Sequence, residues 1–133
     1  MQILNASTEN EIEAAFDTLV RDRIDALFVT PDTYFISQRD QLAALTARYW
    51  IPATFSTREE AEAGGLMSYW ADNHEMWRQI GVYTGQILKG AKPADLPVLQ
   101  STKFELVINL KTAKTLGLTI PAGVLSIADE VIE

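Results

Sequence analysis

The chain alternates short apolar runs with longer segments in which apolar residues recur at every third or fourth position. Short runs that favour extended backbone are typical of buried strands. The strands that this pattern predicts are residues 2–5, 26–30, 51–55, 66–69 and 103–109. Pro31 ends the second run. Pro52 moves the start of the third strand to about Ala53, because proline donates no ladder hydrogen bond.

The segments between these runs have the period of helices. Thr8 and Glu11 have the spacing of a capping box, which predicts a helix with an apolar face made of Ile12, Phe16, Leu19, Val20 and Ile24. Further helices are predicted at residues 37–49, 58–62, 73–88, 110–116 and beyond Pro121. Strands and helices alternate, so we expect βαβ units and an α/β fold with a parallel sheet.

Glycines refine these expectations. Gly64 and Gly65 follow the predicted helix at residues 58–62, and Gly117 follows the helix at residues 110–116, so these glycines are expected to end both helices. Gly81 and Gly85 are four residues apart in the long helix at residues 73–88. Because glycine has no Cβ, we expect close packing against that side of the long helix.

Composition narrows the classes of function. The 133 residues suffice for about one domain, and 47% hydrophobic with 22% charged residues is ordinary for a soluble globular protein. The formal net charge of −7 disfavours nucleic acid, whose phosphates require a Lys/Arg face, and it disfavours anionic membrane surfaces. The sequence has no cysteine, which excludes disulfides, thiolate nucleophiles and Cys-based metal sites.

The first residues, MQILNASTENEIEAAF, lack the basic and apolar regions of a signal peptide. The apolar runs of the chain are also far shorter than a membrane-spanning helix requires. The chain as written is therefore expected to stay in the cytoplasm.

Candidate binding residues follow three of the predicted strands. In open α/β sheets, ligands bind beyond the carboxyl ends of the strands. This rule selects the loops at residues 30–34, 56–58 and 68–70, which contain Asp32, Thr33, Tyr34, Ser56, Arg58 and Tyr69. Asp32 could accept hydrogen bonds from an ammonium group and Arg58 could pair with a carboxylate. Tyr34 or Tyr69 could stack on a flat ligand, so the set would suit an amino-acid-like zwitterion.

Structural roles account for the same residues equally well. Asp32 follows a proline and could stabilise the turn through its own backbone. Tyr34 and Tyr69 could be packed aromatic residues at the edge of the core. Arg58 precedes acidic residues and could form a solvated ion pair, with Glu59, Glu60 and Glu62 on a solvated helix face.

No set of residues in the sequence indicates catalysis. His74 is the only histidine, and it lies in the first turn of the long helix without companion metal ligands at a recognisable spacing. The pair Gly64-Gly65 lacks the rest of a dinucleotide or Walker pattern. We therefore expect no enzyme, no catalytic residue, no metal and no cofactor.

The segment KGAKPADLPVLQSTKFELVINLKTAKTLGLTIP at residues 89–121 resembles the C-terminal tail of substrate-binding proteins of a family of ABC importers, of the tryptophan or aromatic-solute type. The likeness extends through GGLMSYW at residues 64–70, GVYTGQILKG at residues 81–90 and VTPD at residues 29–32. Members of that family are bilobed and hold a small molecule between two α/β lobes. They are roughly twice this long, so the chain would supply a truncated, C-terminal part.

The resemblance implies an incomplete three-layer lobe of a type I periplasmic-binding-protein-like fold with a parallel sheet. Residues 1–66 and 104–133 would belong to the second lobe, and residues 67–103 would form a long helix and crossover that pack on the first lobe. The family comparison puts ligand contacts at the positions of Asp32 and Tyr69. Trp70 stands where relatives usually carry glycine, and its indole could fill the cleft. The family is exported to the periplasm.

The implied function is non-covalent binding of a small organic solute, such as an amino acid, for an ABC importer whose permease would be a partner. The alternative is a non-transport, dimeric α/β module without a ligand. Without a first lobe, the long helix would expose an apolar patch made of Met76, Trp77, Ile80, Tyr83 and Ile87. We therefore expect a homodimer through this helix, unless residues 92–133 fold back and cover it.

Overall fold

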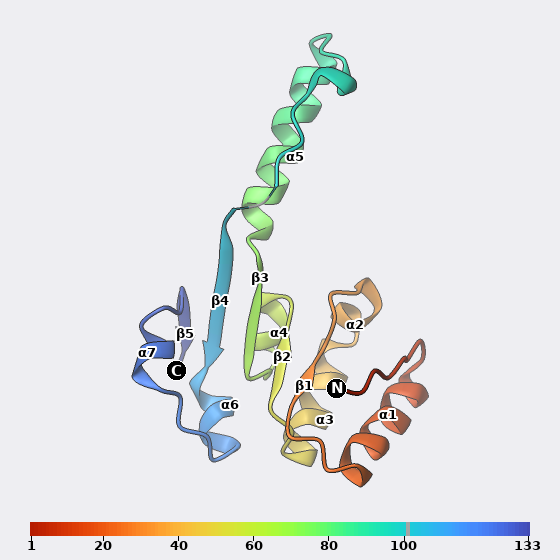
Figure 1. Ribbon diagram of the computed structural model, residues 1–133, viewed down its shortest axis with the longest axis vertical. Helices are drawn as coiled ribbons and strands as arrows, with labels where there is room; N and C mark the ends of the chain where they lie inside the picture. Colours follow the sequence, from red (N-terminus) through yellow and green to blue (C-terminus); the bar gives the residue numbers. More distant parts are fainter. Residues whose placement is uncertain (101) are drawn as a thin grey trace. The chain divides into compact units, whose positions relative to one another are not determined.

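The computed structural model describes residues 1–100 and 102–133 (Figure 1). Ser101, which falls in the predicted crossover of residues 67–103, lies outside the described residues. The chain forms two compact units. One comprises Met1–Tyr69 with Leu106–Glu133, and the other comprises Trp70–Glu105.

A five-stranded sheet organises the fold. Its strands are β1 (Leu27–Phe28), β2 (Ala53–Phe55), β3 (Met67–Ala71), β4 (Phe104–Asn109) and β5 (Glu130–Ile132), and they lie side by side in that order. The pairs β1 with β2, β2 with β3, and β4 with β5 are parallel. In Figure 1, β4 runs in the opposite direction to β3. The amide of Asn109, at the end of β4, donates to the carbonyl of Leu66, just before β3, at 2.9 Å. The predicted α/β fold is confirmed, and the sheet expected to be parallel is mostly parallel.

Seven α-helices and one 3₁₀ helix lie in the described residues. They are α1 (Glu9–Arg21), α2 (Thr33–Ser37), α3 (Arg39–Tyr49), α4 (Arg58–Glu62), α5 (Asn73–Leu88), η1 (Pro93–Asp95), α6 (Leu110–Thr115) and α7 (Ala122–Leu125). Thr8 caps α1, as its spacing from Glu11 predicts. Gly64 and Gly117 follow α4 and α6 with φ of 119° and 67°, values that glycine adopts without steric cost.

The main core lies between the sheet and the helices of the larger unit. Apolar side chains from α1, α3 and the first two strands form one cluster: Ile12, Phe16, Leu19, Val29, Leu42, Leu45, Ile51, Ala53 and Phe55. Phe16 also stacks on Tyr49 at 6.1 Å between ring centroids. Each fully buried large apolar side chain contributes about 1.5–3 kcal/mol, so this cluster holds the first two strands and their carboxyl-terminal loops in place.

Three predicted elements need correction. Residues 2–5 form no strand, because no strand pairs with them among the described residues and Ile3 stays 74% exposed. The helix expected at residues 37–49 is α3 alone, and the separate helix α2 precedes it. The strand predicted at residues 103–109 is not the last, because β5 follows it and pairs through Val107, Ile108 and Asn109.

The smaller unit is built around α5. Asp72 caps this helix by accepting hydrogen bonds from the amides of His74 and Glu75. The hydroxyl of Tyr83 donates to the carbonyl of Pro97 at 2.6 Å, which ties the returning chain to the helix. Open space surrounds the positions where Gly81 and Gly85 would carry a Cβ, so the close packing expected there is not formed within the described residues. Within the described part of the chain, no helix is both long enough and apolar enough to span a membrane.

Candidate functional site

The three selected loops all follow strands of one parallel array. Because β1, β2 and β3 run in the same direction, their carboxyl ends meet at one edge of the sheet. Asp32 follows β1, Ser56 follows β2, and Tyr69 is the middle residue of β3. Neighbouring strands are about 4.8 Å apart, so the outer two of three strands are about 10 Å apart. An amino-acid-sized solute matches that span.

Asp32 is the N-cap of α2. One oxygen of its carboxylate accepts a hydrogen bond from the amide of Tyr34 at 2.7 Å. Asp32 is exposed, and its other carboxylate oxygen has no hydrogen-bond partner among the described residues. The residue therefore fixes the loop and still presents a negative charge to solvent. Both readings of Asp32 from the sequence are compatible with this geometry.

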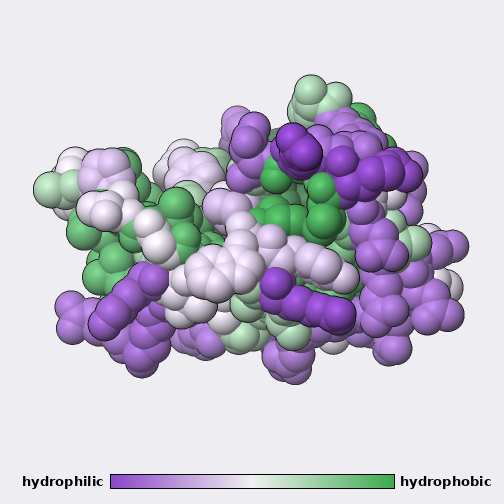
Figure 2. Space-filling model, turned by 90° about the horizontal axis from the view of Figure 1, so that it is seen from below, coloured by the Kyte–Doolittle hydropathy of each residue, from purple (hydrophilic) through white to green (hydrophobic). Residues whose placement is uncertain are grey.

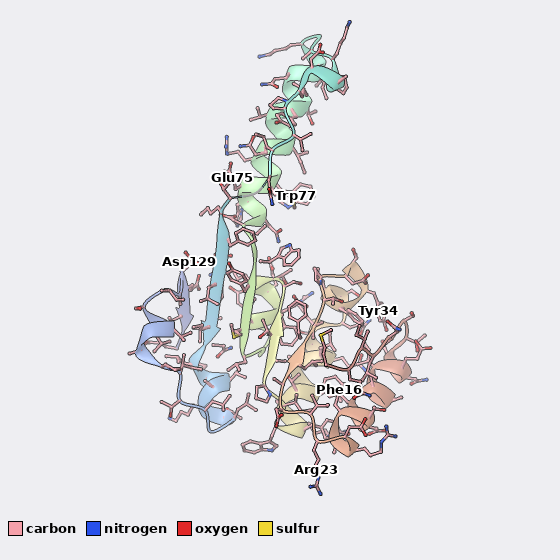
Figure 3. All side chains as sticks on the ribbon, in the orientation of Figure 1. Phe16, Arg23, Tyr34, Glu75, Trp77 and Asp129 are labelled. Atoms are coloured by element: carbon pink, nitrogen blue, oxygen red, sulfur yellow. The ribbon has the colours of Figure 1, made fainter. Side chains whose placement is uncertain are left out.

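Thr33 and Tyr34 begin α2 and face different surroundings. Thr33 is exposed, whereas Tyr34 packs against the main core (Figure 3). Its ring lies 5.8 Å from that of Phe35, and its hydroxyl is buried without a hydrogen-bond partner in the described part of the chain. Burial raises the pKa of Tyr34, and the negative charges of Glu9 and Glu11 raise it further. Tyr34 thus acts in the structure as a packed aromatic residue beside the start of α1.

Ser56 lies in a hydrogen-bonded turn closed by Glu60. A single oxygen of the Glu60 carboxylate accepts from the amide and hydroxyl of Ser56, both at 3.1 Å, and from the amide and hydroxyl of Thr57, at 2.7 and 3.0 Å. Ser56 is 3% exposed and Glu60 is 1% exposed. The turn after β2 is therefore held rigidly, and the hydroxyl of Ser56 is already occupied by a protein acceptor.

Glu60 corrects the interpretation that Glu59, Glu60 and Glu62 form a solvated face. Glu59 and Glu62 are exposed, but Glu60 turns inward and closes a capping box with Thr57. The sequence contained the signal, because Thr57 and Glu60 have the T-x-x-E spacing that capping boxes require. This supporting residue of the candidate site was missed from the sequence.

Arg58 is engaged with two carboxylates. Its Nε lies 2.8 Å from Glu62 on the same helix, and its guanidinium lies 2.5 Å from Glu130 of β5. The expected partners were the adjacent acidic residues, but the strongest contact comes from a residue 72 positions away. A ligand carboxylate could reach this guanidinium only by sharing it with Glu130 or displacing that side chain.

Tyr69 is half exposed, with 50% of its surface accessible. It offers the largest accessible aromatic surface among the six candidate residues of the larger unit. Trp70 follows it directly, is also partly exposed and begins the smaller unit. Asp32, Thr33 and Tyr69 are therefore the exposed members of the candidate set, while Ser56 is buried and Arg58 and Tyr34 are partly buried.

The long helix carries a separate feature. Five large apolar residues of α5 are 40–64% exposed: Met76, Trp77, Ile80, Val82 and Ile87. Leu88, at its end, is 83% exposed, and Trp77 projects from the helix in Figure 3. No residue of α5 is buried. The exposure expected for this patch is thus confirmed for four of its five residues, while Tyr83 is half-buried against Pro97.

His74 is exposed, and its backbone amide donates to Asp72. Among residues 1–100 and 102–133, no group of three or more histidine or acidic side chains is arranged to hold a metal ion.

Comparison with known proteins gives the family context. The family described as "ABC transporter substrate binding protein" matches residues 1–132. An ABC domain from Streptococcus pneumoniae solved in complex with L-Trp is 35% identical, with a TM-score of 0.86. A conserved domain protein from Vibrio cholerae O1 biovar El Tor is 25% identical, with a TM-score of 0.85. The ligand-free, open structure of a Clostridium difficile substrate binding protein with adhesive properties shares the fold, at 24% identity and a TM-score of 0.67.

These alignments cover 95–96% of this chain but only 42–43% of the matched chains. The chain thus spans less than half the length of the structures that it resembles. The comparison with curated proteins gave no match.

Proposed function

Because the chain belongs to the family of ABC transporter substrate-binding proteins, we propose that it binds a small organic solute at the carboxyl ends of β1, β2 and β3. The observation that carries the proposal is the accessible carboxylate of Asp32 and the accessible ring of Tyr69 on one edge of a parallel array. Binding would be non-covalent, and the family is one of binding proteins and not of enzymes.

An amino acid is the solute that this chemistry fits. An ammonium group would donate to the free oxygen of Asp32, and Thr33 would add a hydroxyl at the start of α2. A flat side chain would stack on Tyr69. The solute carboxylate would compete with Glu130 for Arg58. L-Trp is the first solute to test, because a relative 35% identical to this chain was solved with it.

The matched structures are more than twice as long as this chain, so the other half of a closed site would come from elsewhere. With that half present, closure would enclose the solute and present a surface to an ABC permease. The family is normally exported, and we propose the same compartment for the complete binding protein.

Thermal unfolding with L-Trp, other amino acids and small aromatic solutes tests this function. A solute that binds the native state stabilises it by about 2.7 kcal/mol at a hundredfold excess over Kd. We expect the shift to be lost in Tyr69→Ala and in Asp32→Asn. The asparagine variant is well matched, because its side-chain oxygen can still accept from the Tyr34 amide while the charge is gone. Thr115→Ala, on the exposed surface of α6, serves as the control that keeps the shift.

Unchanged melting temperatures across the whole panel would reject solute binding by this chain. They would favour the alternative, a dimeric α/β module without a ligand.

The exposed apolar side of α5 supports a second proposal, that two copies associate through this helix. Large apolar patches are rare on small monomers, and association would bury Met76, Trp77, Ile80 and Ile87. Sedimentation equilibrium at concentrations well above micromolar should give a dimer that dissociates in Trp77→Lys. An unchanged monomer at those concentrations would contradict this proposal and leave solute binding untouched.

A further inference from the structure

Internal carboxylates cap the helices at the candidate site. Helix N-termini are common receptors for a ligand carboxylate, because their free amides and the helix dipole favour negative charge. The helices α2, α4 and α5 are the ones that follow β1, β2 and β3 along the chain. Each of these three N-termini is capped by a carboxylate of the chain itself. A solute carboxylate at any of them would meet a negative charge that is already in place.

The capping carboxylates are those of Asp32, Glu60 and Asp72. Asp32 accepts from one amide of α2 at 2.7 Å. Glu60 accepts from the two amides that precede α4, at 3.1 and 2.7 Å. Asp72 accepts from two amides in the first turn of α5, at 2.8 and 3.3 Å. Glu60 and Asp72 are buried and Asp32 is exposed, so Asp32 is the cap whose charge a solute can reach.

Arg58 is the cation of the candidate set, and Glu130 holds it in a fork. Nη1 of Arg58 lies 2.5 Å from Oε2 of Glu130, and Nη2 donates to Oε1 at 2.7 Å. Its Nε donates to Glu62 at 2.8 Å. Guanidinium groups bind free carboxylates with this same bidentate geometry, so Glu130 occupies the position that a solute carboxylate would need. One positive and two negative charges leave this group of three residues net negative.

Two further cations near these loops are also engaged within the chain. Arg39, the first residue of α3, donates to the carbonyl of Ile36 at 3.5 Å. The ammonium group of Lys103 lies 2.5 Å from the carboxylate of Asp72. Neither side chain is therefore an uncommitted receptor for an anion.

Other arginines lie at the opposite edge of the sheet. Arg21 and Arg48 are in the last turns of α1 and α3, and Arg23 comes just before β1. Arg23 projects from this end of the molecule in Figure 3. Figure 2 views the molecule from this end, where hydrophilic side chains surround a hydrophobic area. These cations lie at the amino ends of β1 and β2, away from the loops that contain Asp32 and Arg58.

We propose that this edge of the sheet selects aromatic amines that lack a carboxylate, an inference that rests on the solute binding proposed above and specifies its class. Asp32 accepts the ammonium group and Tyr69 stacks on the ring. Glu130 determines specificity, because it keeps the guanidinium of Arg58 from the solute. An amino acid has the same ammonium and ring, but its carboxylate adds a repelled charge. Amino acids therefore bind more weakly than the matching amines.

The test compares three probes that share an indole ring: L-tryptophan, L-tryptophan amide and tryptamine. Titration calorimetry with the full chain at about pH 6 keeps the amino groups of all three protonated. Two like charges about 5 Å apart at a partly exposed site change an affinity by roughly tenfold. We therefore expect the amide and tryptamine to bind about tenfold more tightly than L-tryptophan. The amide separates the effect of charge from that of size.

Glu130→Gln tests the role of Glu130. The variant should narrow the gap between L-tryptophan and tryptamine severalfold, because the guanidinium of Arg58 becomes available to the solute carboxylate. Glu59→Gln removes the same charge from an exposed position of α4 and should leave the gap unchanged. Circular dichroism confirms that both variants fold, and the comparison of probes on the unmodified chain depends on neither.

L-Tryptophan that binds as tightly as its amide and tryptamine, or more tightly, would overturn the proposal and leave solute binding intact. A gap that Glu130→Gln does not narrow would also overturn it. Binding of none of the three probes at millimolar concentration would overturn it as well. The melting experiments with the wider panel then decide separately whether the chain binds any solute.

Discussion

Replacing Glu60 by alanine tests the claim that one buried carboxylate fixes the loop after β2. In the folded chain this carboxylate accepts from the amides and hydroxyls of Ser56 and Thr57, and Glu60 is 1% exposed. The substitution leaves two buried amides without an acceptor. An unsatisfied buried donor costs about 1–3 kcal/mol. The hydroxyls can rotate to other acceptors, so the amides dominate the loss.

A second effect of the substitution partly offsets this loss of stability. The other oxygen of Glu60 is buried without a hydrogen-bond partner among the described residues, and removing it relieves a desolvation cost. We therefore expect Glu60→Ala to lower the free energy of unfolding by about 2–4 kcal/mol. Urea denaturation followed by circular dichroism measures this directly. Glu60→Gln, which keeps an oxygen acceptor, should lose less than alanine does.

The matched control is Glu59→Ala on the exposed side of the same helix, which should stay within about 0.5 kcal/mol of the unmodified chain. If Glu60→Ala also stays within that range, the carboxylate does not hold the loop. Since the loop carries Ser56 and Arg58, the account further expects weaker solute binding in Glu60→Ala than in Glu59→Ala.

Two further predictions concern acid and packing. Hydrogen bonds from the Arg78 guanidinium lower the pKa of Glu75 from 4.5 to about 2. Its folded-state pKa is below the unfolded value, so its stabilisation of α5 is complete above pH 4.5 and is lost as the pH falls toward 2. The difference in amide exchange of α5 between Glu75→Gln and the unmodified chain should therefore vanish as the pH falls from 4.5 toward 2. A difference that stays constant over this range would contradict the prediction. A Cβ at Gly65 would lie 2.6 Å from the ring of Phe55, so Gly65→Ala should lower the free energy of unfolding by about 1–3 kcal/mol. Gly123→Ala, which meets no atom within 4 Å, should leave it unchanged in the same urea titration.

Much of the fold could be predicted from local pattern. The strands β1 to β4 and most helices lie where hydrophobic periodicity and end signals indicate, because each pattern reflects a face that the core buries. The expected strand at residues 2–5 failed for a non-local reason. Its composition favours a strand, but a strand also needs a hydrogen-bonded neighbour, and the described chain supplies none.

β5 and the partner of Arg58 were missed for a related reason. The strand at Glu130–Ile132 is too short for periodicity to reveal, and it forms by pairing with β4. That pairing brings Glu130 to Arg58 across 72 positions of sequence, a distance over which local charge patterns are uninformative. The inward orientation of Glu60 could have been predicted from the spacing of Thr57 and Glu60 alone.

The candidate site stays a prediction. The rule for open α/β sheets depends on topology alone, and the loops that it selects follow or end the parallel strands β1, β2 and β3 in the structure. Which side chains are accessible depends on packing. Tyr34 turns toward the core, while Tyr69 stays half exposed.

A ¹⁵N-resolved NMR titration of the chain with L-tryptophan tests the central claim most directly. The account predicts saturable shifts of the amides of Asp32, Thr33 and Tyr69, with smaller ones at Ser56 and Arg58. Spectra that do not change at millimolar L-tryptophan and with the rest of the solute panel, or shifts confined to α5, would contradict it.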